Sequence, residues 1–189
     1  MPPLRHDRES VTTTALALLD RVGLPDLSMR RLAAELDLQP SALYWHFSNK
    51  QELLAAVADR ILAEVPAPAG SAELTAVATA IRDALLAYRD GAEVVMSTHA
   101  LRLGARRPQE ALHAVLGDRA AAEALFEFIL GHATLEQQRM HAQSIGAVQT
   151  DDPDPTAEAD VVFSAGVRSF VALRDASHRA TDAPSTRSR

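Results

Sequence analysis

A pair of short helical patterns joined by a tight break constrains this chain more than any other feature, and it lies between residues 27 and 50. Ser28 is a good N-cap, because its hydroxyl accepts a hydrogen bond from a free backbone N–H of a first helical turn. Apolar residues then recur at helical spacing, at Met29, Leu32, Ala33 and Leu36. The segment is therefore expected to open with an amphipathic helix that buries one face.

A second helix is predicted after the pattern breaks at Asp37 and Leu38. Pro40 suits its first turn, where the missing N–H costs nothing. The spacing of Ser48 and Gln51 is that of an S-x-x-Q capping box, so a third helix is expected to start immediately after Phe47 and to hold the short helix at its far end. The second helix is expected to carry Ser41, Ala42, Tyr44, Trp45 and His46.

Helical periodicity continues through the rest of the chain, and no strand pattern competes with it. A first helix is expected from Val11 to Val22, ended by Gly23. Asp118 is placed to cap a long helix. Apolar stripes predict further helices near residues 53–61, 74–85, 94–96, 108–116, 119–142 and 161–173. An all-α fold follows.

Composition limits the class of protein. The 189 residues, 47% of them hydrophobic, are enough to bury a sizeable core. Cysteine is absent, which excludes disulfides and thiolate metal sites, and no signal sequence or membrane-length apolar run is found, so we expect a cytoplasmic protein without a membrane partner. The net charge of −6 argues against a nucleic-acid partner, but residues 1–50 hold six basic and six acidic side chains, so the acidic excess lies elsewhere.

The first fifty residues fit a helix-turn-helix whose last helix enters the DNA major groove. Gln39, Ser41 and Ala42 lie at the start of that helix, where Ala42 suits a thymine methyl and Gln39 a base edge. Contacts to phosphates set the register of the protein on the duplex. The residues better placed for phosphates are Ser28, Arg30, Tyr44, His46 and Lys50. The predicted DNA-contacting residues are Ser28, Arg30, Gln39, Pro40, Ser41, Ala42, Tyr44, Trp45, His46 and Lys50.

Other classes of protein fit part of the same pattern. In an ordinary helical bundle, Tyr44, Trp45 and Phe47 would be core aromatics and the neighbouring arginines a solvated face. A protein-interaction module would leave Tyr44 and His46 without a role. An enzyme is disfavoured, because the chain lacks a G-x-S-x-G elbow, an H-E-x-x-H pair and a phosphate-cradling loop, so no catalytic residue and no cofactor is predicted.

Residues 43–50, Leu-Tyr-Trp-His-Phe-Ser-Asn-Lys, carry the signature LYWHF-x-N-K. Through it, the segment from Leu27 to Lys50 closely resembles the DNA-binding domain of the TetR family of bacterial transcription repressors. Residues 8–11, 85–92 and 135–138 are similar to their counterparts in the tetracycline-repressor class of that family. The resemblance implies a homodimer that binds a palindromic double-stranded DNA operator, with a C-terminal body that holds a small-molecule effector.

Domain organisation follows from these patterns and the Pro-Ala-Pro-Ala-Gly break at residues 66–70. Residues 1–50 are expected to form the helix-turn-helix domain, joined by a linking helix over residues 49–65. Residues 66–177 are expected to form the effector-binding and dimerisation domain, with a loop at residues 143–156. Residues 178–189 lack apolar periodicity and are expected to be a disordered tail.

The helix at 119–142 and the final helix carry more apolar surface than one small core can bury. Two such helices from each of two subunits would form a four-helix dimer interface, and the alternative is that both are buried within a larger monomer. An effector would act through the helix from Asn49 to Val65 by changing the separation of the two recognition helices. A regulator of the same class that activates, or that has no effector, is the alternative.

The resemblance breaks down in the body. Positions that supply a His, an Asn and a metal-binding His in tetracycline repressors align here with Pro66, Val77 and Val95, whereas Thr98 and Glu136 are retained. We therefore expect a more apolar effector than tetracycline–magnesium. The candidate lining residues are Val77, Ile81, Val95, Met96, Thr98, His99, Phe128, His132 and Glu136.

The same residues include candidate ligands for a metal ion. His132 and Glu136 share a helix face at i, i+4, and His99 is a candidate third ligand. Isolated His and Glu residues are more often part of a hydrogen-bonded structure or of the surface, so no metal is predicted.

Overall fold

The computed structural model describes residues 6–66, 74–147 and 157–181. Within these ranges the chain is entirely helical, which confirms the predicted all-α class. No described helix is long and apolar enough to cross a membrane. The helices are α1 (Arg8–Val22), α2 (Met29–Glu35), α3 (Pro40–Leu43), α4 (Lys50–Ile61), α5 (Leu74–Leu86), α6 (Gly91–Ala100), α7 (Arg106–Leu116), α8 (Arg119–Ser144) and α9 (Ala157–Thr181).

The first helix is fixed at both ends by its own sequence. At its start, the Asp7 carboxylate accepts from the N–H of Ser10, and the Ser10 hydroxyl accepts from the N–H of Asp7. At its end, Gly23 takes a φ of 82° and its N–H donates to the carbonyl of Leu19. This φ lies in the left-handed region that glycine adopts without steric cost, so the predicted end of the helix is confirmed.

The turn between α2 and α3 is a Schellman motif. The N–H of Leu38 donates to the carbonyl of Ala33 at 2.8 Å, and the N–H of Asp37 donates to that of Ala34 at 3.3 Å. Asp37 takes a φ of 55°, which a short polar side chain tolerates better than a bulky one. At the other end of α2, the Ser28 hydroxyl accepts from the N–H of Arg31, as predicted.

The second helix of the pair is shorter than predicted. It ends at Leu43, so Tyr44, Trp45 and His46 lie in the turns that follow it. The N–H groups of Trp45 and His46 donate to carbonyls three residues back, which is a tighter turn than an α-helix. This tightening brings Phe47 into the core, where it is fully buried, while Trp45 remains 87% exposed.

The start of α4 also differs from the prediction, by one residue. The N-cap is Asn49, whose side-chain oxygen accepts from the N–H of Glu52 at 2.9 Å. The Glu52 carboxylate in turn accepts from the N–H of Ser48 at 3.0 Å. The Ser48–Gln51 capping box is therefore wrong in register, although a helix does start immediately after this segment and restrains α3.

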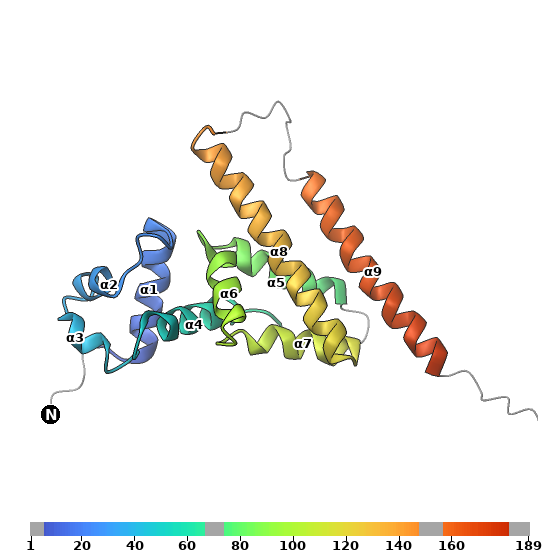
Figure 1. Ribbon diagram of the computed structural model, residues 1–189, viewed down its shortest axis with the longest axis horizontal. Helices are drawn as coiled ribbons and strands as arrows, with labels where there is room; N and C mark the ends of the chain where they lie inside the picture. Colours follow the sequence, from blue (N-terminus) through green and yellow to red (C-terminus); the bar gives the residue numbers. More distant parts are fainter. Residues whose placement is uncertain (1–5, 67–73, 148–156, 182–189) are drawn as a thin grey trace, which may run out of the picture.

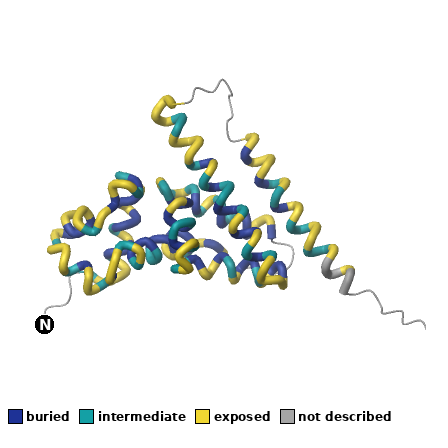
Figure 2. Tube along the Cα trace, in the orientation of Figure 1, coloured by how far each residue is buried: buried dark blue, intermediate teal, exposed yellow. Residues whose placement is uncertain are grey.

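The helix α4 joins an N-terminal unit of α1, α2 and α3 to the helical body (Figure 1). It packs against α1 on one side and against α6 on the other. In the body, α8 packs against α5, α6 and α7, and α9 covers α8 and α5. Buried residues run along α4 from one unit to the other, so a single core extends through both (Figure 2).

Most of the remaining predicted elements are confirmed, but several ends differ. The linking helix predicted over residues 49–65 ends at Ile61, α8 continues through residues 143–144 of the predicted loop, and α9 starts at Ala157. Asp118 caps α8 by accepting from the N–H of Ala120. Helix α9 continues to Thr181, so residues 178–181 are helical where a tail was expected. Three predicted stretches lie wholly or mostly outside the described residues: the boundary at 66–70, the loop at 143–156 and the last part of the tail, at 182–189.

The neighbouring aromatics Phe47 and Trp45 give a direct test of this local structure. Phe47→Ala is expected to lower the free energy of unfolding by about 3–5 kcal/mol, because it leaves a cavity in the core. Trp45→Ala is expected to change it by less than about 0.5 kcal/mol, because the indole is mostly in solvent. Urea unfolding of the two variants checks this. Equal losses would show that the turn after α3 is misplaced.

Candidate nucleic-acid interface and body cavity

The ten residues predicted to contact DNA all lie on one part of the N-terminal unit: α2, α3, the residues flanking them and the start of α4. None of them is buried. Their backbone is held by the caps of α2 and α4, whereas the core beneath is made by Leu32, Leu43 and Phe47. The exposed members are Ser28, Arg30, Gln39, Pro40, Ser41, Tyr44 and Trp45, and the half-buried ones are Ala42, His46 and Lys50.

Several cations of this unit are engaged within the protein. Arg21 pairs with Glu35 at 2.6 Å, and Arg31 lies 3.8 Å from Asp26. The Arg8 guanidinium stacks on a neighbouring aromatic ring, with its carbon 4.1 Å from the ring centroid, and donates to a backbone carbonyl.

Two cations of the predicted DNA-contacting set remain without a carboxylate partner among the described residues, Arg30 and Lys50. Arg30 lies in the first turn of α2, and Lys50 is the first residue of α4. Positive charge available to a phosphate is therefore concentrated at two helix starts that flank α3.

The body contains an open cavity of about 1070 Å³ between α6, α7 and the first half of α8. Its lining is mixed in character: apolar groups such as Met96 and Leu130 stand beside many charged and polar ones. The charged and polar lining residues are His99, Arg102, Arg106, Gln109, Asp118, Arg119, Glu123 and Glu127.

The structure divides the residues that were predicted to line an effector pocket into three groups. Met96 and His99 line the cavity. Phe128, His132 and Glu136 lie instead on a face of α8 near α9. The members that pack in the core, each with no more than 1% of its surface exposed, are Val77, Ile81, Val95 and Thr98.

Thr98 is occupied within its own helix, because its hydroxyl donates to the carbonyls of Val94 and Val95, each at 3.0 Å. It is retained from the tetracycline-repressor pattern, but its hydroxyl proton already has partners.

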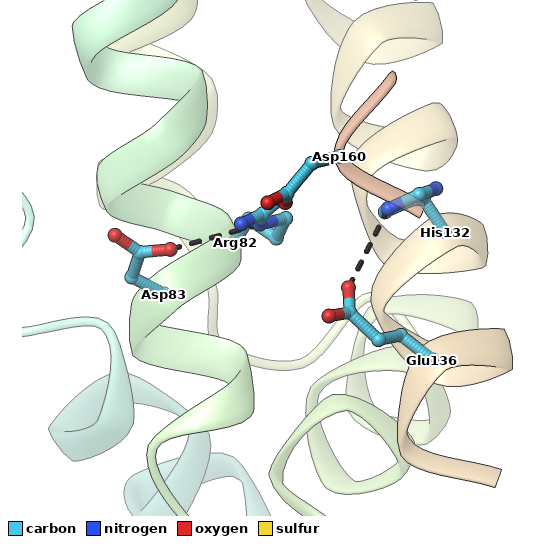
Figure 3. A network of polar contacts seen from close by, with 5 residues as sticks. All are labelled: Arg82, Asp83, His132, Glu136 and Asp160. Atoms are coloured by element: carbon cyan, nitrogen blue, oxygen red, sulfur yellow. Dashed lines mark hydrogen bonds and ion pairs between the residues drawn. The ribbon is translucent and has the colours of Figure 1, made fainter. Parts of the chain in front are cut away.

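A partly buried polar network joins α5, α8 and α9 (Figure 3). Arg82 of α5 donates to Asp160 of α9 at 2.6 Å, and its guanidinium carbon lies 4.7 Å from the ring centroid of Phe163. Beside it, His132 Nε2 lies 3.5 Å from Glu136 Oε2, and both side chains are only 9% exposed. The ion pair and the aromatic contact together hold α9 on the body.

The His132–Glu136 contact is not a strong ion pair. Burial lowers the pKa of His132 below its ordinary 6.5, and Arg82 and Arg139 lower it further. Burial also raises the pKa of Glu136 above its ordinary 4.5. Both shifts disfavour the charged forms, and neither of the two facing atoms makes a hydrogen bond within the described residues.

Aromatic side chains complete the contact between α8 and α9. Phe128 stacks on Phe163 with ring centroids 6.1 Å apart and lies 6.4 Å from Phe170. Gly166 permits this approach, since a Cβ there would overlap the Phe128 ring. Phe128 therefore serves the helix packing in this chain.

Hydrogen bonds from backbone N–H groups to carboxylates tie the N-terminal unit to the body. Asp59 of α4 accepts from the N–H of Ala105 at 2.7 Å, in the loop between α6 and α7. Asp90, before α6, accepts from the N–H of Leu24 at 2.7 Å. Asp20 of α1 accepts from the N–H of Arg89 at 3.0 Å.

Sequence reasoning missed these residues, together with Arg82 and Glu123. The partners of Asp59 and Arg82 lie 46 and 78 residues away along the chain. No local spacing marks such a pair, so the signal appears only when the fold brings the elements together.

The geometry defines a class of protein: a helix-turn-helix unit joined through one helix to a helical body with an open cavity of mixed lining. The family model described as bacterial regulatory proteins, tetR family, matches residues 11–57. The tetracycline repressor protein class C of Escherichia coli is 45% identical over 98 residues, which cover 48% of this chain and 45% of the repressor. The chain thus spans about half the length of this curated relative.

Solved structures are similar over nearly the whole chain. Mycobacterium smegmatis BioQ is 35% identical with a TM-score of 0.78, over 91% of this chain and 99% of its own. BioQ with its natural double-stranded DNA operator gives 33% identity and a TM-score of 0.75, over 90% of this chain and 98% of that one. A TetR variant from Acinetobacter baumannii AYE, in complex with minocycline, is 32% identical with a TM-score of 0.71. The match covers 90% of this chain and 99% of that one.

The chain belongs to the TetR family. The family consists of regulatory proteins, so this membership places the protein among regulators and not among enzymes. It confirms the resemblance found in the LYWHF-x-N-K signature, which lies entirely within the matched segment.

The lowered pKa of His132 predicts a pH dependence of stability. Below pH 6.5, the unfolded chain binds a proton at this imidazole that the folded chain does not bind, so the free energy of unfolding falls as the pH drops from 6.5 through the folded-state pKa. His132→Gln removes this contribution. Urea unfolding at pH 7.5, 6.5 and 5.5 should show the wild type losing stability relative to the variant on acidification. A difference that does not change with pH would contradict the assignment.

Proposed function

We propose that this protein is a homodimeric transcriptional repressor that binds a palindromic DNA operator and is released from it by a small-molecule effector. The observation that carries the proposal is the exposed surface of α2, α3 and the start of α4, with its ten predicted contact residues on one unit. The similar BioQ structure with its double-stranded DNA operator supports DNA as the partner.

The roles of the side chains follow from their positions. Gln39 precedes α3 and its side chain makes no capping hydrogen bond, so its amide is available to a base edge. Ala42 presents a methyl group of the size that contacts a thymine methyl. Arg30 and Lys50 supply the charge for phosphates, and the Ser28 hydroxyl, which accepts from a backbone N–H, still has its proton to donate.

Dimerisation is supported by apolar side chains that α8 and α9 leave in solvent. A monomer that reads one half-site contacts too little DNA, and a two-fold dimer places its recognition helices about 34 Å apart in successive major grooves. Exposed apolar surface of this kind on two long adjacent helices is typical of a subunit interface. The exposed apolar residues are Leu135, Met140 and Ile145 of α8 and its end, and Val161, Val162 and Leu173 of α9.

The effector is proposed to bind in the body and to differ from tetracycline–magnesium. Pro66, Val77 and Val95 stand where the resemblance expects a His, an Asn and a metal-binding His, and none of these three offers a side-chain hydrogen bond or a metal ligand. The cavity between α6, α7 and α8 is the proposed site. Its charged lining favours a polar effector over the apolar one expected from sequence.

DNA binding is tested by selection of operators from a random duplex pool, followed by substitution. Lys50→Ala is expected to weaken binding to all sequences and to reduce the slope of log K against log salt by about 1, because one phosphate contact is lost. Gln39→Ala is expected to lose about 1–3 kcal/mol of discrimination at one base pair.

The control for charge is Arg21→Ala, which removes the same charge from a residue already paired with Glu35. It should leave the salt slope nearly unchanged. Failure to select any palindrome would sink the repressor proposal, and a change in base preference caused by Lys50→Ala alone would reverse the assigned roles.

The dimer is tested by light scattering at micromolar concentration, where the wild type is expected to have twice the mass of one chain. Leu135→Glu combined with Val161→Glu should give a folded monomer, because two charges would be buried without partners in the interface. Trp45→Glu, at an exposed aromatic on the other unit, should remain dimeric. A monomeric wild type would refute the interface.

A further inference from the structure

His99 of α6 and two carboxylates of α8, Glu123 and Glu127, converge on the wall of the body cavity. One ligand atom from each lies within 4.8 Å of the others. His99 Nε2 is 3.3 Å from Glu123 Oε1. The sequence had grouped His99 with His132 and Glu136, but among the described residues His99 joins these two carboxylates instead.

We propose that His99, Glu123 and Glu127 form a binding site for a divalent transition-metal ion. The set offers one imidazole nitrogen and two carboxylate oxygens, which are ligands for Zn²⁺ and its first-row neighbours. Mg²⁺ and Ca²⁺ prefer oxygen ligands alone, so the imidazole directs the site toward transition metals. This site is independent of the proposed DNA-binding function.

The three ligand atoms are near enough to bind one ion after a small adjustment. Around a tetrahedral ion with bonds of about 2.0–2.2 Å, ligand atoms lie roughly 3.3–3.6 Å apart, so a group that spans up to 4.8 Å must close by about 1 Å. Glu127 is exposed, so its side chain can move toward the other two. Glu123 and Glu127 are also like charges at i, i+4 on one helix, and a cation between them relieves their repulsion.

The imidazole is held in place by its surroundings. The ring of His99 meets that of Phe126 edge-on, with centroids 5.1 Å apart. On the other side, the amide nitrogen of Gln109 donates to Glu123 Oε2 at 2.8 Å and lies 3.4 Å from His99 Nδ1. For Nε2 to bind a metal ion, Nδ1 must carry the proton, so the Gln109 amide would rotate, give up its bond to Glu123 and accept from Nδ1–H, while Glu123 turns to the ion. Gln109 is therefore assigned as a positioning residue.

Three arginines line the same cavity, Arg102, Arg106 and Arg119. None of them forms an ion pair with Glu123 or Glu127 in the described part of the chain. Their charges oppose a bare cation, but three protein ligands leave open coordination positions, and an anion there would face the guanidinium groups. The lining thus suits a metal ion whose coordination is completed by water or an anion.

The test is calorimetric titration of the full-length, tag-free chain with ZnCl₂, with Co²⁺ absorption as a second readout. One ion per chain is expected, together with a visible band for Co²⁺. His99→Gln and the double variant Glu123→Gln/Glu127→Gln should abolish both signals, and Gln109→Ala should weaken binding by about 10–100-fold. Circular dichroism shows whether each variant is folded.

The matched control is His132→Gln. It removes a different histidine that lies near a carboxylate, that of Glu136, but that is not part of the proposed site. It should bind Zn²⁺ like the wild type. The proposal is overturned if the wild type binds neither ion, if folded His99→Gln binds both unchanged, or if His132→Gln is the variant that loses binding.

Discussion

One hydrogen bond, from the N–H of Ala105 to the Asp59 carboxylate, links the two halves of this protein at a position that water does not reach. It acts together with the bonds accepted by Asp20 and Asp90 and with the core that α4 shares with both halves. Ala105 is 1% exposed, so its N–H has no access to water and depends on that carboxylate. A buried donor without a partner costs about 1–3 kcal/mol. Because Asp59 belongs to α4, whose first residue is Lys50, this bond ties the predicted DNA-contacting surface to the loop between α6 and α7.

That loop is also the wall of the cavity. Arg102 and Ala105 both take a φ of 57°, and each such non-glycine residue costs about 1–3 kcal/mol unless its surroundings enforce it. Arg102, Gly104 and Arg106 line the cavity, so a molecule bound there would lie beside this loop. A ligand that relaxes this backbone would weaken the hold on Asp59. Differential affinity for the two loop conformations is all that coupling to α4 requires.

The parts of the fold that were predictable are those whose physical causes are local. Gly23 and Ser28 act within a few residues of themselves, and their effects on α1 and α2 could be read directly. Asn49 could not be separated from Ser48, because either side chain can cap and the choice depends on how tightly the chain turns to bury Phe47. The cavity, and the partner of His99, depend on how α6 meets α8, which periodicity does not specify.

The charge of the N-terminal unit also could not be fully interpreted from the sequence, and this affects the expected DNA binding. Residues 1–50 carry no net charge, but the sequence does not show which of their cations are free of ion pairs. The fold commits Arg21 to Glu35 and lays Arg8 on Phe47, and of the predicted contact residues only Arg30 and Lys50 remain as unpaired cations in the described structure. With two free cations in the predicted contact set, direct neutralisation of phosphates by side chains is small, so the affinity for DNA must depend more on base contacts. A DNA-binding surface with few free cations is expected to be more selective, because non-specific binding comes almost entirely from contacts to phosphates.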